Sequence, residues 1–230
     1  MAHRSNSLAL YVEVGKRCTL AGAIEWPGWC RGDRNEEAAL RALIEYGPRY
    51  ERAMRAAGIS FQAPADTSVI EVVERLKGTG TTDFGAPDVA PSSDASPVDD
   101  SDLQRLQALL KACWAALDEA AQAADGKELR KGPRGGGRDL AGVIGHVVGA
   151  EASYLRRLGG KPPAEKYEDD PAQVMEQQRR LILETLGPAA RGEVPPPGPR
   201  GGSRWSPRYF VRRAAWHILD HAWEIEDRIV

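Results

Sequence analysis

The chain has 230 residues, of which 42% are hydrophobic and 28% charged, with a formal net charge of −2. This composition is typical of a folded globular protein and excludes a disordered chain. A net charge so close to zero gives no overall field that would attract nucleic acid or an anionic membrane surface, so neither partner is expected. No stretch approaches the ~18 apolar residues of a membrane span, and the first residues lack the apolar core of a secretory signal. A cytoplasmic location is therefore expected.

The first third of the sequence holds short runs with partial alternation of apolar and polar residues, and one helical pattern. The expected strands are 8–14, 18–24 and 69–76. Asn35 is a suitable N-cap, and Glu36 and Glu37 would lie in the first turn, where the helix dipole favours acidic groups. These residues predict a helix over 35–54. Residues 1–85 are therefore predicted to form a small α+β domain.

Residues 86–101 are rich in Pro, Ser and Asp without a sustained apolar period, which predicts a linker. Residues 102–230 carry apolar side chains at helical spacing in four segments. The expected helices are 100–124, 139–158, 170–187 and 206–228. Asp139 and Ser206 are predicted N-caps, and the third helix is predicted to end before Gly187-Pro188. Four amphipathic helices of this length commonly pack together, so the predicted fold class is a small α+β domain followed by an all-α four-helix bundle.

Histidines provide the most specific functional pattern in the sequence. His217 and His221 are four residues apart, which places both imidazoles on one helix face, and His146 lies on the apolar side of another predicted helix. Three neutral imidazoles suit zinc, nickel, copper or iron and leave coordination positions open for water or substrate. Each histidine could instead be a buried imidazole satisfied by a hydrogen bond, or lie on a solvated face. The residues alone leave both interpretations open.

Two segments then suggest a family. Gly145–Leu155 and Ala215–Glu224 resemble the DinB-like four-helix bundles, which include the metal-binding domain of thiol-dependent maleylpyruvate isomerases. The resemblance covers about residues 100–230. It implies that His146, His217 and His221 bind one divalent transition metal, with nickel, zinc or iron as the candidates. Some members of that superfamily transfer groups to low-molecular-weight thiols such as mycothiol or bacillithiol, so the resemblance also implies a possible thiol cofactor.

Two further residues near the histidine pair are candidates for catalysis. Arg213 precedes His217 by one helical turn and could bind an anionic group of a substrate; the alternative is a solvated surface arginine. Glu224 follows His217 by two turns and could act as a general base or support a metal ligand. Its alternative role is an exposed ion pair with Arg228, four residues later.

The N-terminal part has a second, less specific resemblance. Tyr11–Val14, Ala21–Trp29 and Asn35–Leu40 look like the HicB-like antitoxin fold, in which strands pass through a Pro-Gly turn into a helix begun by acidic residues. Such modules bind a protein partner or self-associate, which implies a possible homodimer. No separate DNA-binding segment accompanies it, so an accessory domain is the plainer hypothesis.

Two classes of function follow from these patterns. The first is a metal-dependent enzyme acting on a small-molecule substrate, a transferase of thiol-dependent type or a hydrolase. The second is a non-catalytic binding or regulatory module, in which the metal is structural or vestigial and the N-terminal domain binds a partner.

Overall fold

The computed structural model describes residues 7–131, 137–197 and 202–230, and the chain divides into two compact units, Met1–Ala95 and Ser96–Val230. The first ten residues of the predicted linker thus belong to the first unit. They are held there by Glu13, whose buried carboxylate accepts hydrogen bonds from the backbone amides of Asp88, at 3.1 Å, and Val89, at 3.2 Å.

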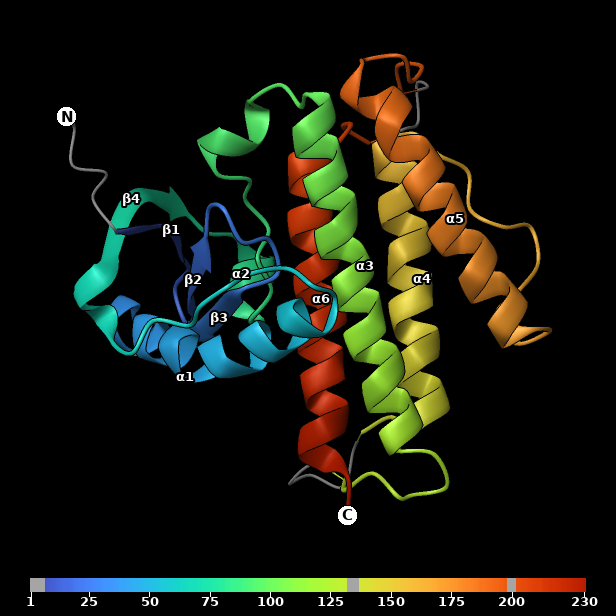
Figure 1. The fold of residues 1–230 in the computed structure, drawn as a ribbon, viewed down its shortest axis with the longest axis horizontal. Helices are drawn as coiled ribbons and strands as arrows, with labels where there is room; N and C mark the ends of the chain where they lie inside the picture. The colour runs from blue at the N-terminus through green and yellow to red at the C-terminus, as the bar shows by residue number, and fades with distance from the viewer. Residues whose placement is uncertain (1–6, 132–136, 198–201) are drawn as a thin grey trace. The chain divides into compact units, whose positions relative to one another are not determined.

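The first unit is a small sheet domain with one long helix (Figure 1). Its elements are β1 (Leu8–Val14), β2 (Thr19–Ala23), β3 (Cys30–Asp33), α1 (Glu36–Ala56), β4 (Ile70–Lys77) and the short α2 (Gly80–Asp83), with 3-10 turns at Thr67–Val69 and Ser92–Ala95. The strand order is β3-β2-β1-β4, in which β1 and β4 are parallel and the other pairs antiparallel. The sequence did not predict β3, because this strand is short and ends in charged residues without alternation.

The core of the first unit lies between its sheet and α1. Leu10 and Val12 of β1 and Leu43 of α1 are fully buried. Trp29 donates its indole N–H to the carbonyl of Leu43 over 2.9 Å, and Tyr50 stacks on the Trp29 ring with centroids 6.1 Å apart. These contacts join the turn before β3 to α1, so the aromatic residues of this turn serve packing.

The second unit is helical, and its four long helices within the described residues are α3 (Asp100–Ala123), α4 (Leu140–Leu158), α5 (Pro171–Ala190) and α6 (Pro207–Arg228). Each predicted cap is confirmed: the side chain of Asp139 accepts from the amide of Gly142, and that of Ser206 accepts from the amide of Tyr209. Both caps satisfy backbone donors that a helix leaves unpaired at its start.

The prediction that the third helix ends before Gly187-Pro188 was wrong, because α5 continues to Ala190. Proline inside a helix removes one backbone hydrogen bond, and near the last turn little further structure depends on that bond. The amide of Arg191 still donates to the carbonyl of Gly187 over 3.2 Å, and Leu186 remains fully buried. The burial of Leu186 therefore outweighs the loss of the hydrogen bond that Pro188 cannot donate.

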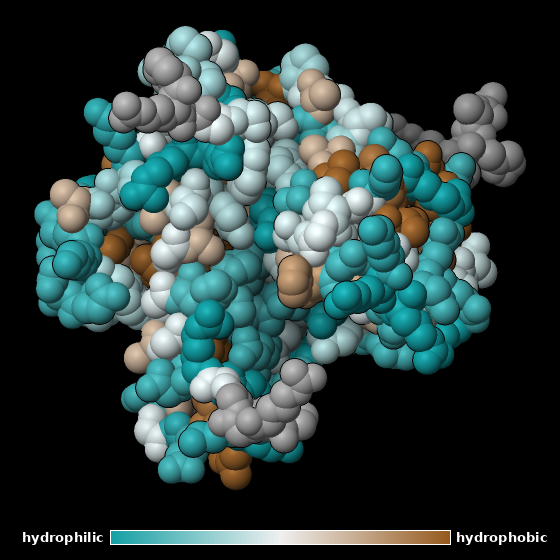
Figure 2. All heavy atoms as spheres, turned by 180° about the vertical axis from the view of Figure 1, so that it is seen from behind, coloured by the Kyte–Doolittle hydropathy of each residue, from teal (hydrophilic) through white to brown (hydrophobic). Residues whose placement is uncertain are grey.

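Helix α6 buries more of its side chains than any other described helix of the second unit. It packs against α3 and α4, while α4 also packs against α5 (Figure 1). The buried side chains of α6 include Phe210, Ala214, Ile218, Leu219 and Ile225. The face of the molecule drawn in Figure 2 is largely hydrophilic, with hydrophobic residues in small separate groups. The packing of α4 along α6 brings the predicted histidines together.

Candidate metal centre

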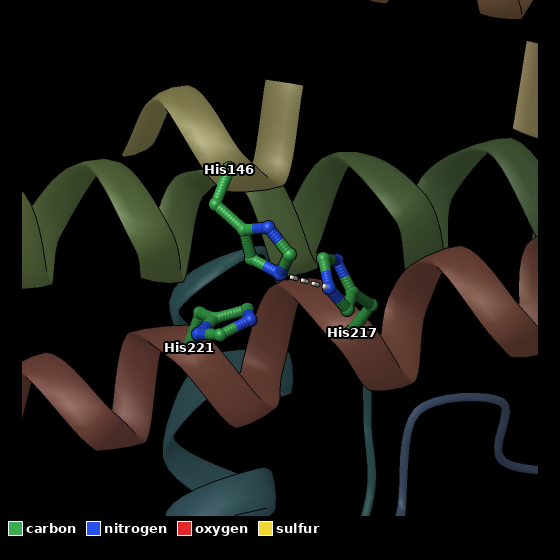
Figure 3. Close-up of side chains that lie close together, drawn as sticks. All are labelled: His146, His217 and His221. Carbon is green, nitrogen blue, oxygen red and sulfur yellow. Dashed lines mark hydrogen bonds between the residues drawn. The ribbon is translucent and has the colours of Figure 1, made fainter. Parts of the chain in front are cut away.

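The three predicted histidines meet between α4 and α6, and we call them the histidine triad. His217 and His221 project from successive turns of α6, and His146 projects toward them from α4 (Figure 3). The Nε2 atoms of His146 and His217 are 3.3 Å apart, and one ring nitrogen from each of the three residues lies within 4.8 Å of the others. The fourth histidine, His3, lies outside the described residues.

The geometry and chemistry of the triad fit a transition-metal ion. Two nitrogens that each lie ~2.0–2.1 Å from one tetrahedral ion are separated by about 3.3–3.4 Å, which matches the Nε2 to Nε2 distance. Desolvation, followed by the charge of His221 and Arg213, lowers the pKa of His217 to about 2, and burial also lowers the pKa of His146. Both imidazoles are therefore neutral near pH 7, the form that binds a metal.

One buried atom of the triad also lacks a partner. His217 is 7% exposed, and its Nδ1 has no hydrogen-bond partner among the residues that the structure describes. A buried nitrogen in that condition usually binds a water, ion or ligand, or has a functional role. Three converging imidazoles with an unpaired nitrogen differ from the alternative of isolated core histidines, each satisfied by its own hydrogen bond.

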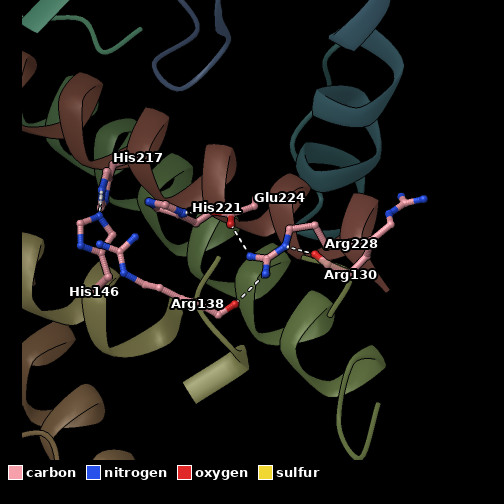
Figure 4. Close-up of polar contacts among 7 residues, drawn as sticks. All are labelled: Arg130, Arg138, His146, His217, His221, Glu224 and Arg228. Carbon is pink, nitrogen blue, oxygen red and sulfur yellow. Dashed lines mark hydrogen bonds and ion pairs between the residues drawn. The ribbon is translucent and has the colours of Figure 1, made fainter. Parts of the chain in front are cut away.

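Glu224 supports the triad through His221. Its carboxylate lies 2.7 Å from Nδ1 of His221, and its other oxygen pairs with Arg228 at 2.5 Å. Arg228 in turn donates to the backbone carbonyls of Arg130 and Arg138 (Figure 4). When Nδ1 carries the proton, Nε2 is left free for a metal, and this is the usual arrangement of a carboxylate behind a histidine ligand.

The same contacts bear on the chemistry of Glu224. The hydrogen bond from His221, opposed by desolvation and assisted by Arg228, lowers the pKa of Glu224 to about 2. A carboxylate with so low a pKa is a weak base near neutral pH. The geometry thus favours the supporting role considered for Glu224 over that of general base, and the expected pairing with Arg228 is present as well.

Arg213 lies beside the triad and is not a solvated surface arginine. Its guanidinium carbon is 4.7 Å from the ring centroid of Trp216 and 5.5 Å from that of Tyr154. Its Nη1 atom is buried with no hydrogen-bond partner among the described residues. The Tyr154 ring also meets the His217 ring edge-on, with centroids 5.8 Å apart.

A groove opens on the outer side of His146. It has a volume of about 580 Å³, within the usual range for small-molecule sites. It is lined by Arg138, Ala141, Gly142, Gly145, His146, Tyr167, Glu168 and Pro171. A Cβ atom on Gly145 would lie 3.0 Å from the Tyr167 ring, so the absence of a side chain there lets Tyr167 cover this part of α4.

Sequence reasoning did not assign a role to Tyr154, Tyr167 or Arg138. Tyr154 follows His146 by eight residues, about two helical turns, so its place near the triad was detectable from spacing. Arg138 directly precedes the N-cap of α4, and its charge contributes to the lowered pKa of His146. Tyr167 lies in the connection between α4 and α5, where no periodic signal exists.

The comparisons with known proteins bear on the second unit. Within the described residues, no helix has both the length and the apolar character needed to cross a membrane. No curated protein and no solved structure matches the chain. The family model described as the DinB superfamily matches residues 109–225, just over half of the chain and including the whole triad. Because that match lies outside the first unit, the HicB-like resemblance stays a prediction; the chain itself belongs to the DinB superfamily.

Proposed function

We propose that α3–α6 form a DinB-like four-helix bundle whose histidine triad holds one divalent transition metal in a metal-dependent enzyme. The observation that carries the proposal is the convergence of three imidazoles from two helices, with Nε2 atoms of His146 and His217 spaced as two ligands of one ion. Membership of the DinB superfamily, whose members commonly bind metals, supports the same assignment.

The proposed ligands are His146, His217 and His221, and each has different surroundings. His217 is nearly enclosed by the helices, His146 borders the open groove, and His221 is oriented by Glu224. Three protein ligands leave coordination positions free, which is typical of catalytic sites, whereas structural zinc sites usually have four. The openness beside His146 therefore favours catalysis over a structural metal.

The chemistry proposed is that of a transferase of thiol-dependent type or a hydrolase. A divalent metal in the triad would supply a Lewis acid and a position for a water molecule or a thiolate. The protein's own residues would orient the ligands, accommodate a small-molecule substrate in the groove and limit water near His217. Nickel, zinc and iron all accept imidazole ligands, and we propose these as the candidate metals.

Elemental analysis of protein purified without a histidine tag or added metal tests this proposal. Near-stoichiometric nickel, zinc or iron in the wild type, lost in both His146→Ala and His217→Ala, is the expected result. His3→Ala, which removes the one histidine outside the triad, is the matched control and should retain the metal. A wild type that holds no metal and takes none up on titration would overturn the proposal.

Activity then separates the two classes of function. The metal-loaded protein should hydrolyse activated esters or transfer electrophiles to a low-molecular-weight thiol, and both triad variants should lose that activity. A metal-loaded protein without either activity, in which metal removal unfolds the second unit, would favour a structural metal in a binding module.

A further inference from the structure

Arg213 of the second unit has a guanidinium nitrogen, Nη1, that lacks a hydrogen-bond acceptor among the described residues. It lies on α6 one turn before His217, with its guanidinium over the Trp216 ring and near the Tyr154 ring. Stacking of this kind satisfies the face of a guanidinium. It leaves the N–H groups at the edge in need of acceptors, and buried Nη1 has none among the described residues.

Other arginines of α6 show how the fold pairs such groups. Arg208 forms an ion pair with Asp102, and Arg228 forms one with Glu224. Arg213 has no carboxylate partner within the described part of the second unit, and the residues outside the described ranges contain no Asp or Glu. A partly buried guanidinium without an acceptor is costly for stability alone, which points to a ligand that supplies one.

The position of Arg213 connects it to the histidine triad. The Tyr154 ring contacts both groups, with its centroid 5.8 Å from that of His217 and 5.5 Å from the guanidinium carbon of Arg213. An anion bound at the Arg213 guanidinium would therefore lie beside the triad, within the length of a small molecule. The aromatic rings around Arg213 reduce its exposure to water, which strengthens a charge-assisted hydrogen bond.

We propose that Arg213 is a specificity-determining residue that binds a carboxylate-sized anionic group of the substrate acted on at the histidine triad. This inference rests on the proposed function, because the triad is what makes the bound molecule a substrate. A guanidinium presents parallel N–H donors that match the two oxygens of a carboxylate, which a lysine cannot do. Neutral molecules of the same shape should bind more weakly.

Benzoate and benzamide test this proposal, because they share a ring and differ in charge. Isothermal titration calorimetry of the full chain, made metal-free with EDTA, measures binding at Arg213 without ligation of a metal by benzoate. The wild type should bind benzoate ~10-fold more tightly than benzamide, and Arg213→Met should remove this preference. Arg180→Met, which changes an exposed arginine of α5 paired with Glu184, is the control and should keep it.

A second variant, Arg213→Lys, tests the same inference if Arg213→Met fails to fold. Arg213→Lys retains the positive charge but loses the paired donors, so the preference for benzoate should fall several-fold and not vanish. An unchanged preference in either variant, or equal binding of benzoate and benzamide by the wild type, would overturn the inference.

The design also separates this inference from the proposed function. If elemental analysis shows metal on the triad but Arg213→Met keeps the benzoate preference, only the inference fails. If the protein takes up no metal but the preference depends on Arg213, the proposed function fails and Arg213 remains an anion-binding residue.

Discussion

Helix α4 contributes His146 and Glu151, five residues apart, to two separate polar clusters. The clusters differ in whether their polar atoms have hydrogen-bond partners. Glu151 is 2% exposed and accepts a hydrogen bond of 2.6 Å from the indole N–H of Trp114. Gln178 of α5 is also buried and donates to the carbonyl of Val148 over 2.8 Å. The indole N–H of Trp114 and the amide N–H of Gln178 thus both have acceptors, so the cluster closes on itself in the core.

The histidine triad is the opposite case. His217 is as well covered as many core residues, yet its Nδ1 has no partner among the described residues, and His146 borders an open groove. A buried polar cluster that satisfies itself stabilises one packed state, whereas a cluster with an unpaired atom needs a ligand. Both His217 and Glu151 are buried, so the difference between their two clusters lies in which polar atoms have hydrogen-bond partners.

The largest expected effect comes from removing Glu151 from the closed cluster. Glu151→Ala should lower the free energy of unfolding by about 3–4 kcal/mol, because it leaves the Trp114 N–H without an acceptor and opens a cavity. In metal-free protein, His217→Ala should lower it by only about 1–2 kcal/mol, since the cavity it opens is offset in part by the removal of an unpaired buried nitrogen. Urea denaturation in EDTA measures both values. Equal losses in the two variants would contradict the distinction.

The second effect is the pH dependence of the closed cluster. Desolvation raises the pKa of Glu151 from 4.5 to about 7. Between these values the folded protein keeps a proton that the unfolded chain has released, so the stability present below pH 4.5 is lost as pH rises through about 7. The loss corresponds to roughly 3 kcal/mol at most.

Glu151→Gln isolates this contribution, because it keeps the shape of the side chain but does not titrate. The difference in unfolding free energy between wild type and Glu151→Gln, measured from pH 4 to 8, should change by up to ~3 kcal/mol in favour of the variant. A difference that stays constant over this range would show that Glu151 keeps an ordinary pKa.

Both clusters were only partly visible in the sequence. Helical spacing placed His217 and His221 on one face and His146 on the apolar side of its helix, so a periodic pattern alone predicted that they could meet. The contact of Glu224 with His221 follows the same local geometry, three residues apart. Helical periodicity is the part of a fold that a single sequence records most directly.

Features that depend on packing between distant segments were not predictable. The burial of Glu151 against Trp114 joins positions 37 residues apart, and an acidic residue in an amphipathic pattern is ordinarily expected on the surface. Tyr167 reaches Gly145 from a connection without periodicity. Whether Nη1 of Arg213 is paired depends on which acceptors the fold brings to it, and only the folded structure shows that no described residue accepts a hydrogen bond from it.

A smaller effect tests whether Glu224 supports the triad. Glu224→Gln should weaken zinc affinity 10- to 100-fold, because an amide holds the Nδ1 proton of His221 less strongly than a carboxylate. Competition between the protein and a chromogenic chelator measures the affinity. Glu184→Gln, an exposed acidic residue of α5, is the control. An affinity that is unchanged in Glu224→Gln, or that falls equally in the control, would exclude the supporting role.

The smallest expected effect comes from adding a methyl group at Gly145 or Gly149, the glycines of α4 on either side of His146 in the sequence. Gly149 faces open space, whereas Gly145 is packed against Tyr167. A Cβ atom on Gly149 would meet nothing within 4 Å, whereas one on Gly145 would lie 3.0 and 3.2 Å from two ring atoms of Tyr167. Gly149→Ala should therefore stabilise α4 by about 0.5–1 kcal/mol, the ordinary gain of alanine over glycine in a helix. Gly145→Ala has the same intrinsic gain but must displace Tyr167, so its net effect should be smaller or destabilising. Thermal unfolding of the two variants side by side measures the difference, and equal stabilisation would mean that Tyr167 does not pack closely over α4 and that the groove beside His146 is wider than described.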